Sequence, residues 1–210
     1  VFSEDMADAF CRALNDWLVT EWLDKDARLR GSIVIPVQSV EKSVAEIERC
    51  AKDKRFVQVL MLVAGDMPLG KRHYWPIYAA CERLGLPVGI HAGSNYHNPP
   101  TSVGWGSYHI EDYVAQAQAF QTQLTSLIVE GVFAKYPNLK MVMLESGFTW
   151  LPAYLWRLHK FWRGVRMETP WVDRPPAEIV RSNIRFSLQP VDAPPEPETL
   201  NRLFDHMQSD

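Results

Sequence analysis

The chain has 210 residues, of which 47% are hydrophobic and 22% charged, a composition typical of an ordinary globular protein. Its formal net charge is −3, and its Lys and Arg are spread along the chain, so it offers no basic surface for nucleic acid or an anionic membrane. No apolar run approaches the roughly 20 residues that span a bilayer. We therefore expect neither a nucleic-acid partner nor a membrane partner, and a single domain over residues 1–210.

The cysteines indicate a reducing environment. Cys11, Cys50 and Cys81 stand singly, without C-x-x-C spacing, in segments that are expected to be helical. Their odd number and surroundings predict reduced, half-buried thiols rather than a disulfide framework. The first residues carry neither the basic nor the apolar region of a signal peptide. These features predict a cytoplasmic protein.

Hydrophobic periodicity predicts helices and strands in alternation. In chain order we expect a helix over residues 6–18, a strand over 33–37, a helix over 40–51 capped by Ser39, a strand over 57–63, a helix over 73–84, a strand ending at His91, a helix over 111–131, a strand over 139–145, a helix over 151–162, a strand over 184–189 and a helix over 200–207. Such alternation is typical of βαβ units, so the sequence predicts an α/β protein with a parallel sheet.

The loops favour a (β/α) barrel. Connections that lead into strands are short, whereas those that follow strands are long, notably residues 65–72, 93–108 and 191–197. This asymmetry is expected of a barrel with its working loops at the carboxyl ends of the strands. An open doubly wound sheet is the alternative, but no Gly-rich nucleotide-binding turn supports it. A TIM barrel needs eight strands, so we expect a partial (β/α)8 barrel with five parallel strands, as though the first two strands and the last were missing.

His91 is the candidate metal ligand. It follows the buried run of residues 86–90 and so lies at a strand tip, where α/β proteins build active sites. Its imidazole suits Zn²⁺ or another divalent transition ion, although it could instead be a core histidine bonded to backbone. One ligand makes no site, and the sequence has no H-x-H, H-E-x-x-H or Cys/His cluster. The other histidines are expected at the surface: His73, His97, His109, His159 and His206.

Glu145 is the candidate catalytic residue. It comes directly after the apolar strand of residues 139–144, where a carboxylate is costly to bury without a purpose or a partner. It could pair with Arg157 or cap the helix that begins near Thr149. It could also ligate a metal, orient a ligand histidine or move a proton. The residues alone leave these alternatives open.

Other polar side chains that follow strand ends could bind a substrate. We expect substrate-binding roles for Gln38, Asn95 and Gln189. Ser94 and Ser146 also follow strand ends, but neither lies in a G-x-S-x-G elbow with an evident base. A serine hydrolase is therefore not expected.

Several motifs together resemble the amidohydrolase-related family of (β/α)8 metal enzymes, which includes aminocarboxymuconate semialdehyde decarboxylase, aromatic-acid decarboxylases, and lactone or amide hydrolases. The matching residues are 32–37, 56–62, 86–93, 136–140, 145–147, 150–152 and 186–190. The resemblance implies that His91 is the metal ligand of the fifth barrel strand. Glu145 stands where many members keep a histidine, so that residue's role does not carry over. The family's first-strand H-x-H and eighth-strand aspartate have no counterpart in these residues.

This resemblance implies a divalent metal cofactor, Zn²⁺ first and Mn²⁺ as the alternative, and a small-molecule substrate. We expect a hydrolase that acts on a carboxylated or cyclic compound through metal-activated water. One alternative is a non-oxidative decarboxylase of the same family. Another is a catalytically incomplete barrel segment whose unpaired sheet edges favour self-association into a homo-oligomer.

Overall fold

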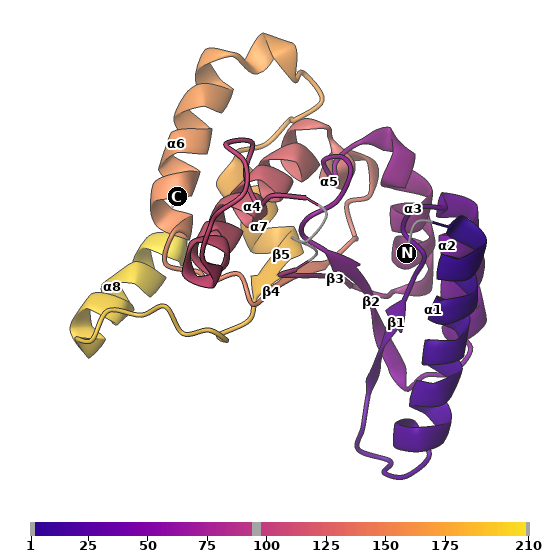
Figure 1. The fold of residues 1–210 in the computed structure, drawn as a ribbon. Helices are drawn as coiled ribbons and strands as arrows, with labels where there is room; N and C mark the ends of the chain where they lie inside the picture. Colours follow the sequence, from indigo (N-terminus) through magenta and orange to yellow (C-terminus); the bar gives the residue numbers. More distant parts are fainter. Residues whose placement is uncertain (1–2, 94–97, 209–210) are drawn as a thin grey trace.

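A five-stranded parallel sheet organises the protein (Figure 1). The computed structural model describes residues 3–93 and 98–208. The strands are β1 (Gly31–Val34), β2 (Phe56–Leu62), β3 (Val88–His91), β4 (Met141–Leu144) and β5 (Ile184–Phe186). The helices are α1 (Glu4–Leu18), α2 (Val40–Cys50), α3 (Trp75–Leu84), α4 (His109–Val129), α5 (Val132–Lys135), α6 (Leu151–Gly164), α7 (Pro176–Asn183) and α8 (Pro197–Gln208).

The strand order is that of a barrel segment. Neighbours in the sheet are neighbours in the chain, in the order β1-β2-β3-β4-β5, and every pair is parallel. A doubly wound sheet reverses its order at a switch point, and this one does not. The prediction of an α/β fold with five parallel strands is confirmed, and the doubly wound alternative is wrong.

The two faces of the sheet differ in burial. Ile33, Val59, Ile90 and Met143 point to one face and are almost completely buried in the core. On the other face the side chains are less covered, and Leu62 is 44% exposed. Because side chains alternate along a strand, Gly89 and His91 share this more open face. Figure 1 shows α1, α2 and α3 gathered beside β1 to β3, with α6 and α8 at the opposite end of the sheet.

Two strands end three residues earlier than the sequence predicts. Strand β1 stops at Val34 rather than at residue 37, because Pro36 has no N–H to donate and the chain turns, with Ser39 N donating to the Pro36 carbonyl at 2.8 Å. Strand β5 stops at Phe186 rather than at residue 189. Ser39 does occupy the N-cap position of α2, but its side chain makes no capping hydrogen bond.

Two helices were not predicted. Helix α5 has only four residues, too few for a periodic pattern, and follows Gly131 in the left-handed conformation at φ 84°. Helix α7 begins at Pro176, after a proline-rich approach that reads as a loop. Proline is favoured in a first helical turn, where its missing N–H costs nothing.

The cysteines are free, as predicted, but two are more buried than expected. Cys11 is half-buried, whereas Cys50 and Cys81 are buried. Burial raises the pKa of Cys11 to about 11 and that of Cys50 to about 12, and it also raises the pKa of Cys81 to about 12. Such thiols stay protonated and unreactive near neutral pH.

Asn15 joins α1 to the edge of the sheet. Its side-chain amide donates to the Val34 carbonyl at 2.9 Å, and Val34 N donates to Asn15 Oδ1 at 3.0 Å. The same amide donates to Glu46 Oε1 on α2 at 2.8 Å. One buried side chain therefore fixes β1 against both neighbouring helices.

Helix α4 anchors the long loop that follows β2. Gln123 donates to the Val63 carbonyl at 2.6 Å and accepts from Leu69 N at 2.7 Å. Gly70 lies so close to the backbone of α4 that a Cβ at Gly70 would be 2.2 Å from the Ser126 carbonyl oxygen. The loop is thus held on α4 near the carboxyl ends of the strands.

Within the described ranges, 3–93 and 98–208, we find no helix with both the length and the apolar character needed to cross a membrane. The prediction of one domain over residues 1–210 stays a prediction.

Candidate metal centre

The carboxyl ends of β3, β4 and β5 bring three chemically active residues together. His91 ends β3, Glu145 follows β4, and Ser187 follows β5. His91 Nε2 lies 3.3 Å from Glu145 Oε2, and the two side chains are 41% and 33% exposed. This pair lies at the sheet edge where ligands bind in parallel α/β proteins.

The hydrogen bonding of His91 fixes which nitrogen is available. Its Nδ1 is 2.7 Å from the Ala92 carbonyl oxygen, which can only accept, so Nδ1 donates. A neutral ring then has its lone pair on Nε2, which faces a carboxylate oxygen, another acceptor. Two acceptors at this distance need a cation between them, either a proton on Nε2 or a metal ion. The alternative of a core histidine bonded to backbone therefore describes only one of the two ring nitrogens.

The donor set fits a divalent transition ion. Imidazole nitrogen and carboxylate oxygen bind such ions at about 2.0–2.2 Å, which places two adjacent ligand atoms about 3.0–3.4 Å apart. The observed separation of 3.3 Å falls within that range. In the part of the chain that the structure describes, however, no group of three or more His, Cys, Asp or Glu is placed to hold a metal ion. The described residues thus supply two ligands, fewer than the three protein ligands of a typical catalytic zinc site.

Glu145 has an unusual backbone conformation. Its φ of 59° lies in the left-handed region that non-glycine residues rarely adopt, at a cost of about 1–3 kcal/mol. Its N–H donates to Ser187 Oγ at 3.0 Å, which ties the turn to the segment after β5. Such conformations cluster at functional sites, where surrounding contacts maintain them.

The two structural alternatives for Glu145 are wrong for the described residues. Arg157 lies with its guanidinium 5.2 Å from the centre of the Phe161 ring rather than beside Glu145. Helix α6 begins at Leu151 without a side-chain capping bond. Glu145 instead accepts a hydrogen bond from Tyr113 Oη at 3.3 Å. The carboxylate therefore faces the strand ends and not α6.

Tyr113 is a member of the site that the sequence did not reveal. Partial loss of water raises the pKa of its phenol above the ordinary value, and the charge of Glu145, the hydrogen bond to it and the charge of Asp192 add to the effect. Tyr113 therefore remains a neutral donor. Asp192 lies nearby, since a Cβ on Gly147 would be 2.2 Å from its Oδ2. Ser187 and Asp192 belong to segments that the sequence marked as functional, but nothing in the pattern of α4 distinguished Tyr113.

The predicted substrate-binding residues lie at different places. Gln189 is exposed, and its carbonyl accepts from Ser187 Oγ at 3.0 Å, one bond away from the Glu145 turn. Gln38 is exposed in the turn after β1, and β2 separates that strand from β3. Asn95 lies outside the described residues, as do Ser94 and His97. The structure therefore brings only Gln189 near the pair.

Three of the remaining histidines within the described ranges are exposed at the surface, as predicted, and one is partly covered. His73, His109 and His206 are exposed, and His159 is half-buried. His109 begins α4, and its ring centre is 6.1 Å from that of Tyr113.

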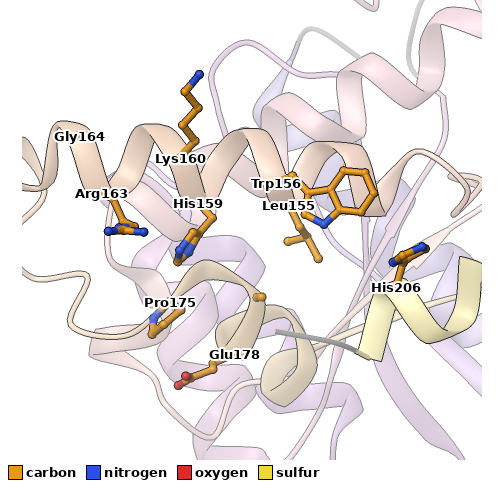
Figure 2. Close-up of a pocket in the computed structure, with 10 residues that line it drawn as sticks. Leu155, Trp156, His159, Lys160, Arg163, Gly164, Pro175, Glu178 and His206 are labelled. Carbon is orange, nitrogen blue, oxygen red and sulfur yellow. The ribbon is translucent and has the colours of Figure 1, made fainter.

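Two cavities differ in their relation to the pair. The larger, about 870 Å³, lies between α6, α7 and α8, and its lining includes neither His91 nor Glu145 (Figure 2). In Figure 2 His159 and Arg163 point from α6 toward α7, whereas Lys160 points away. A second cavity, about 600 Å³, lies between the loop after β2, residues 98–103 and α4, and is lined in part by Val63. Val63 N donates to the His91 carbonyl at 2.8 Å, but neither His91 nor Glu145 lines this second cavity.

A (β/α) barrel enzyme builds its active site at the carboxyl ends of its parallel strands, which is where this chain carries His91 and Glu145. Comparison with known proteins agrees: the model of the amidohydrolase family, Amidohydro_2, matches residues 1–210. The chain belongs to the amidohydrolase family.

Named relatives are decarboxylases. The chain is 27% identical to gamma-resorcylate decarboxylase of Rhodococcus jostii over 176 residues, which are 79% of this chain and 51% of that protein. It is 29% identical to 2-amino-3-carboxymuconate-6-semialdehyde decarboxylase of Dictyostelium discoideum over 139 residues, or 64% of this chain and 36% of that protein. The chain thus spans about half the length, or less, of these curated relatives.

A solved structure shares the fold. A dihydroxybenzoic acid decarboxylase from a Polaromonas species, with bound manganese and the inhibitor 2-nitroresorcinol, superposes with a TM-score of 0.68 at 24% identity. The match covers 88% of this chain and 57% of that one. The predicted partial barrel is confirmed by this likeness.

Proposed function

We propose that this chain forms the metal-binding part of a decarboxylase of the amidohydrolase family that acts on a small aromatic or enoic acid. The observation that carries the metal dependence is the separation of 3.3 Å between His91 Nε2 and the Glu145 carboxylate, since two acceptors at that distance need a cation between them. The named relatives support decarboxylation over the hydrolysis that the sequence alone favoured.

The residues of the pair have distinct tasks in this proposal. His91 binds the ion through Nε2, because the Ala92 carbonyl engages Nδ1 and so fixes the tautomer and the ring orientation. Glu145 is the catalytic carboxylate, within reach of the ion and of any group bound to it. When bound, a divalent ion supplies Lewis acidity toward the carboxylate and hydroxyl of the substrate.

Manganese is the ion we propose first. A carboxylate beside an imidazole is a mixed oxygen and nitrogen donor set, and carboxylate ligands suit Mn²⁺. The Polaromonas decarboxylase holds manganese, which supports this choice over the zinc that the sequence favoured.

The substrate would lie in the cavity beside Val63, whose backbone N–H donates to the His91 carbonyl. Polar side chains of Asp66, Gln118, Thr122 and Gln123 contribute to its wall. We retain Gln38, Asn95 and Gln189 as proposed substrate-binding residues. Their amides could bond to a carboxylate or hydroxyl of the substrate.

Product analysis of the Mn²⁺-loaded chain tests this function. With 2,6-dihydroxybenzoate as the probe, we expect CO₂ release that is lost in His91→Ala. Cleavage of a lactone or amide without CO₂ release would support the hydrolase alternative. If neither product forms and Mn²⁺ does not bind, the proposed function is wrong for this chain. Size-exclusion chromatography then tests the alternative of self-association, because β1 and β5 each pair on one side only within the described sheet.

A further inference from the structure

The two oxygens of the Glu145 carboxylate have different neighbours, Tyr113 and His91. The phenol of Tyr113 donates to Oε1 at 3.3 Å, while Oε2 lies 3.3 Å from His91 Nε2. Each carboxylate oxygen therefore has its own neighbour. The Glu145 side chain thus faces the proposed cation position with Oε2, while the neutral phenol of Tyr113 holds Oε1.

We propose that Tyr113 is a positioning residue that holds the Glu145 carboxylate beside His91, so that imidazole and carboxylate bind the divalent cation together. The inference rests on the proposed function, since it assigns the way in which that metal centre is preorganised. Glu145 needs such support because its side chain is one-third exposed. Without a partner, an exposed side chain changes freely between rotamers. Ser187 fixes its backbone, and Tyr113 fixes its tip.

Helix α4 is well placed to set the spacing of the pair. Tyr113 and Gln116 are three residues apart and so lie on the same face of this 21-residue helix. Gln116 Oε1 accepts from Gly93 N at 3.3 Å, two residues beyond His91, while Tyr113 reaches Glu145. One helix face thus contacts the segments that follow β3 and β4. Because a helix is stiff over one turn, the two contacts fix the histidine and the carboxylate relative to each other.

The test is Mn²⁺ affinity of the full 210-residue chain, measured by electron paramagnetic resonance of free Mn²⁺ up to millimolar concentration. Tyr113→Phe removes only the hydroxyl and keeps the ring that faces His109. We expect Mn²⁺ affinity to fall about 10-fold, the lower end of the range for residues that orient a metal ligand. The unfolding midpoint should stay unchanged. The matched control is Tyr136→Phe, because Tyr136 lies before β4, at the opposite end of the strand from Glu145, and packs against Trp75.

A double variant separates positioning from a merely structural role. If Tyr113 acts through the carboxylate, Tyr113→Phe combined with Glu145→Gln should bind Mn²⁺ no more weakly than Glu145→Gln alone. Additive losses, a lowered unfolding midpoint with unchanged affinity, or no effect of Tyr113→Phe would each overturn the inference.

His91→Ala distinguishes this inference from the proposed function. If His91→Ala binds Mn²⁺ as well as the unaltered chain does, the metal centre itself is wrong, and the role of Tyr113 is wrong with it. If His91→Ala loses binding while Tyr113→Phe does not, only the positioning role is wrong.

Discussion

Glu46 and Glu145 are both carboxylates with several close neighbours, yet their surroundings are opposite in kind. Glu46 on α2 has a fully buried side chain and accepts from Asn15 at 2.8 Å, from Arg49 Nε and Nη2 at 2.7 Å and from Cys50 Sγ at 3.3 Å. Burial alone would raise its pKa, but the hydrogen bonds from Arg49, Asn15 and Cys50 and the charge of Arg49 lower it.

Glu145 instead has a donor, Tyr113 Oη, beside one carboxylate oxygen and the His91 ring nitrogen Nε2 beside the other. It is half-buried, its backbone is in a costly conformation, and its Oε2 lies 3.3 Å from His91 Nε2, a separation that needs a proton or a metal ion between the two atoms. A carboxylate whose neighbours all donate serves the fold, whereas one that faces another acceptor is available for a cation. The kind of neighbouring group therefore distinguishes a carboxylate that stabilises the fold from one that can bind a cation better than burial alone does.

The largest effect is expected at Glu46. Glu46→Gln removes the charge and presents an amide to donors that need an acceptor, so we expect a loss of about 3 kcal/mol in the free energy of unfolding by urea. This is the low end for a broken buried pair, because Arg49 is one-third exposed and keeps Asp16 as a partner. Glu41→Gln, at an exposed position of the same helix, is the control and should cost less than about 0.5 kcal/mol. Equal losses in the two variants would contradict the structural role.

The difference in stability between the unaltered chain and Glu46→Gln should depend on pH, because the pKa of Glu46 is lowered in the folded state. A folded-state pKa below the ordinary 4.5 means that the unfolded chain binds the proton more readily, so stability rises with pH in this range. The contribution is complete above that ordinary value and is lost as pH falls through the folded pKa. The stability gap between the unaltered chain and Glu46→Gln should therefore narrow on acidification below about pH 4.5. A gap that widens there would show that the charge is not what stabilises.

A smaller loss is expected at Ser187. Ser187→Ala removes the acceptor of the Glu145 N–H and the donor to the Gln189 carbonyl, so we expect about 1 kcal/mol less stability by urea unfolding, with weaker Mn²⁺ binding. Ser107→Ala, at an exposed position outside the lining of the proposed substrate cavity, should leave both quantities unchanged. Mn²⁺ affinity that survives Ser187→Ala would mean that the turn keeps its shape without this bond.

The smallest effect has the opposite sign. Glu145→Gly relieves the left-handed backbone, so we expect the chain to become more stable by about 0.5 kcal/mol, after allowance for the greater freedom of glycine in the unfolded chain. Mn²⁺ affinity should fall at the same time. A loss of stability comparable to that of Glu46→Gln would end the distinction between the two carboxylates.

The sequence predicted the sheet well because its signals are local. Apolar runs, helical periodicity and the lengths of the loops predicted five parallel strands, and the strand ends identified His91 and Glu145. Their proximity follows from the rule that parallel strands present their carboxyl ends at one edge. Helices α5 and α7 were not predicted, because α5 is a single turn and α7 begins directly after a proline-rich segment.

The rest of the site depends on contacts that no local pattern records. Tyr113 reaches Glu145 from a helix 32 residues away in the chain, and its position depends on the course of the loop between β3 and α4. The tautomer of His91 depends on the direction of one carbonyl, that of Ala92. Hydrolase and decarboxylase share the strand-end residues, so the sequence did not separate them.

The bonds between Asn15 and Val34 have a consequence for how this sheet can grow. Both backbone polar groups of Val34 are already satisfied by a side-chain amide, in the manner of a neighbouring strand. A strand that added to this edge would have to end before it reached Val34, or it would displace Asn15. Displacement of Asn15 would leave Glu46 without one of its hydrogen-bond donors. The amide therefore occupies the edge groups of Val34 that an added strand would need, and so opposes edge-to-edge pairing at that residue.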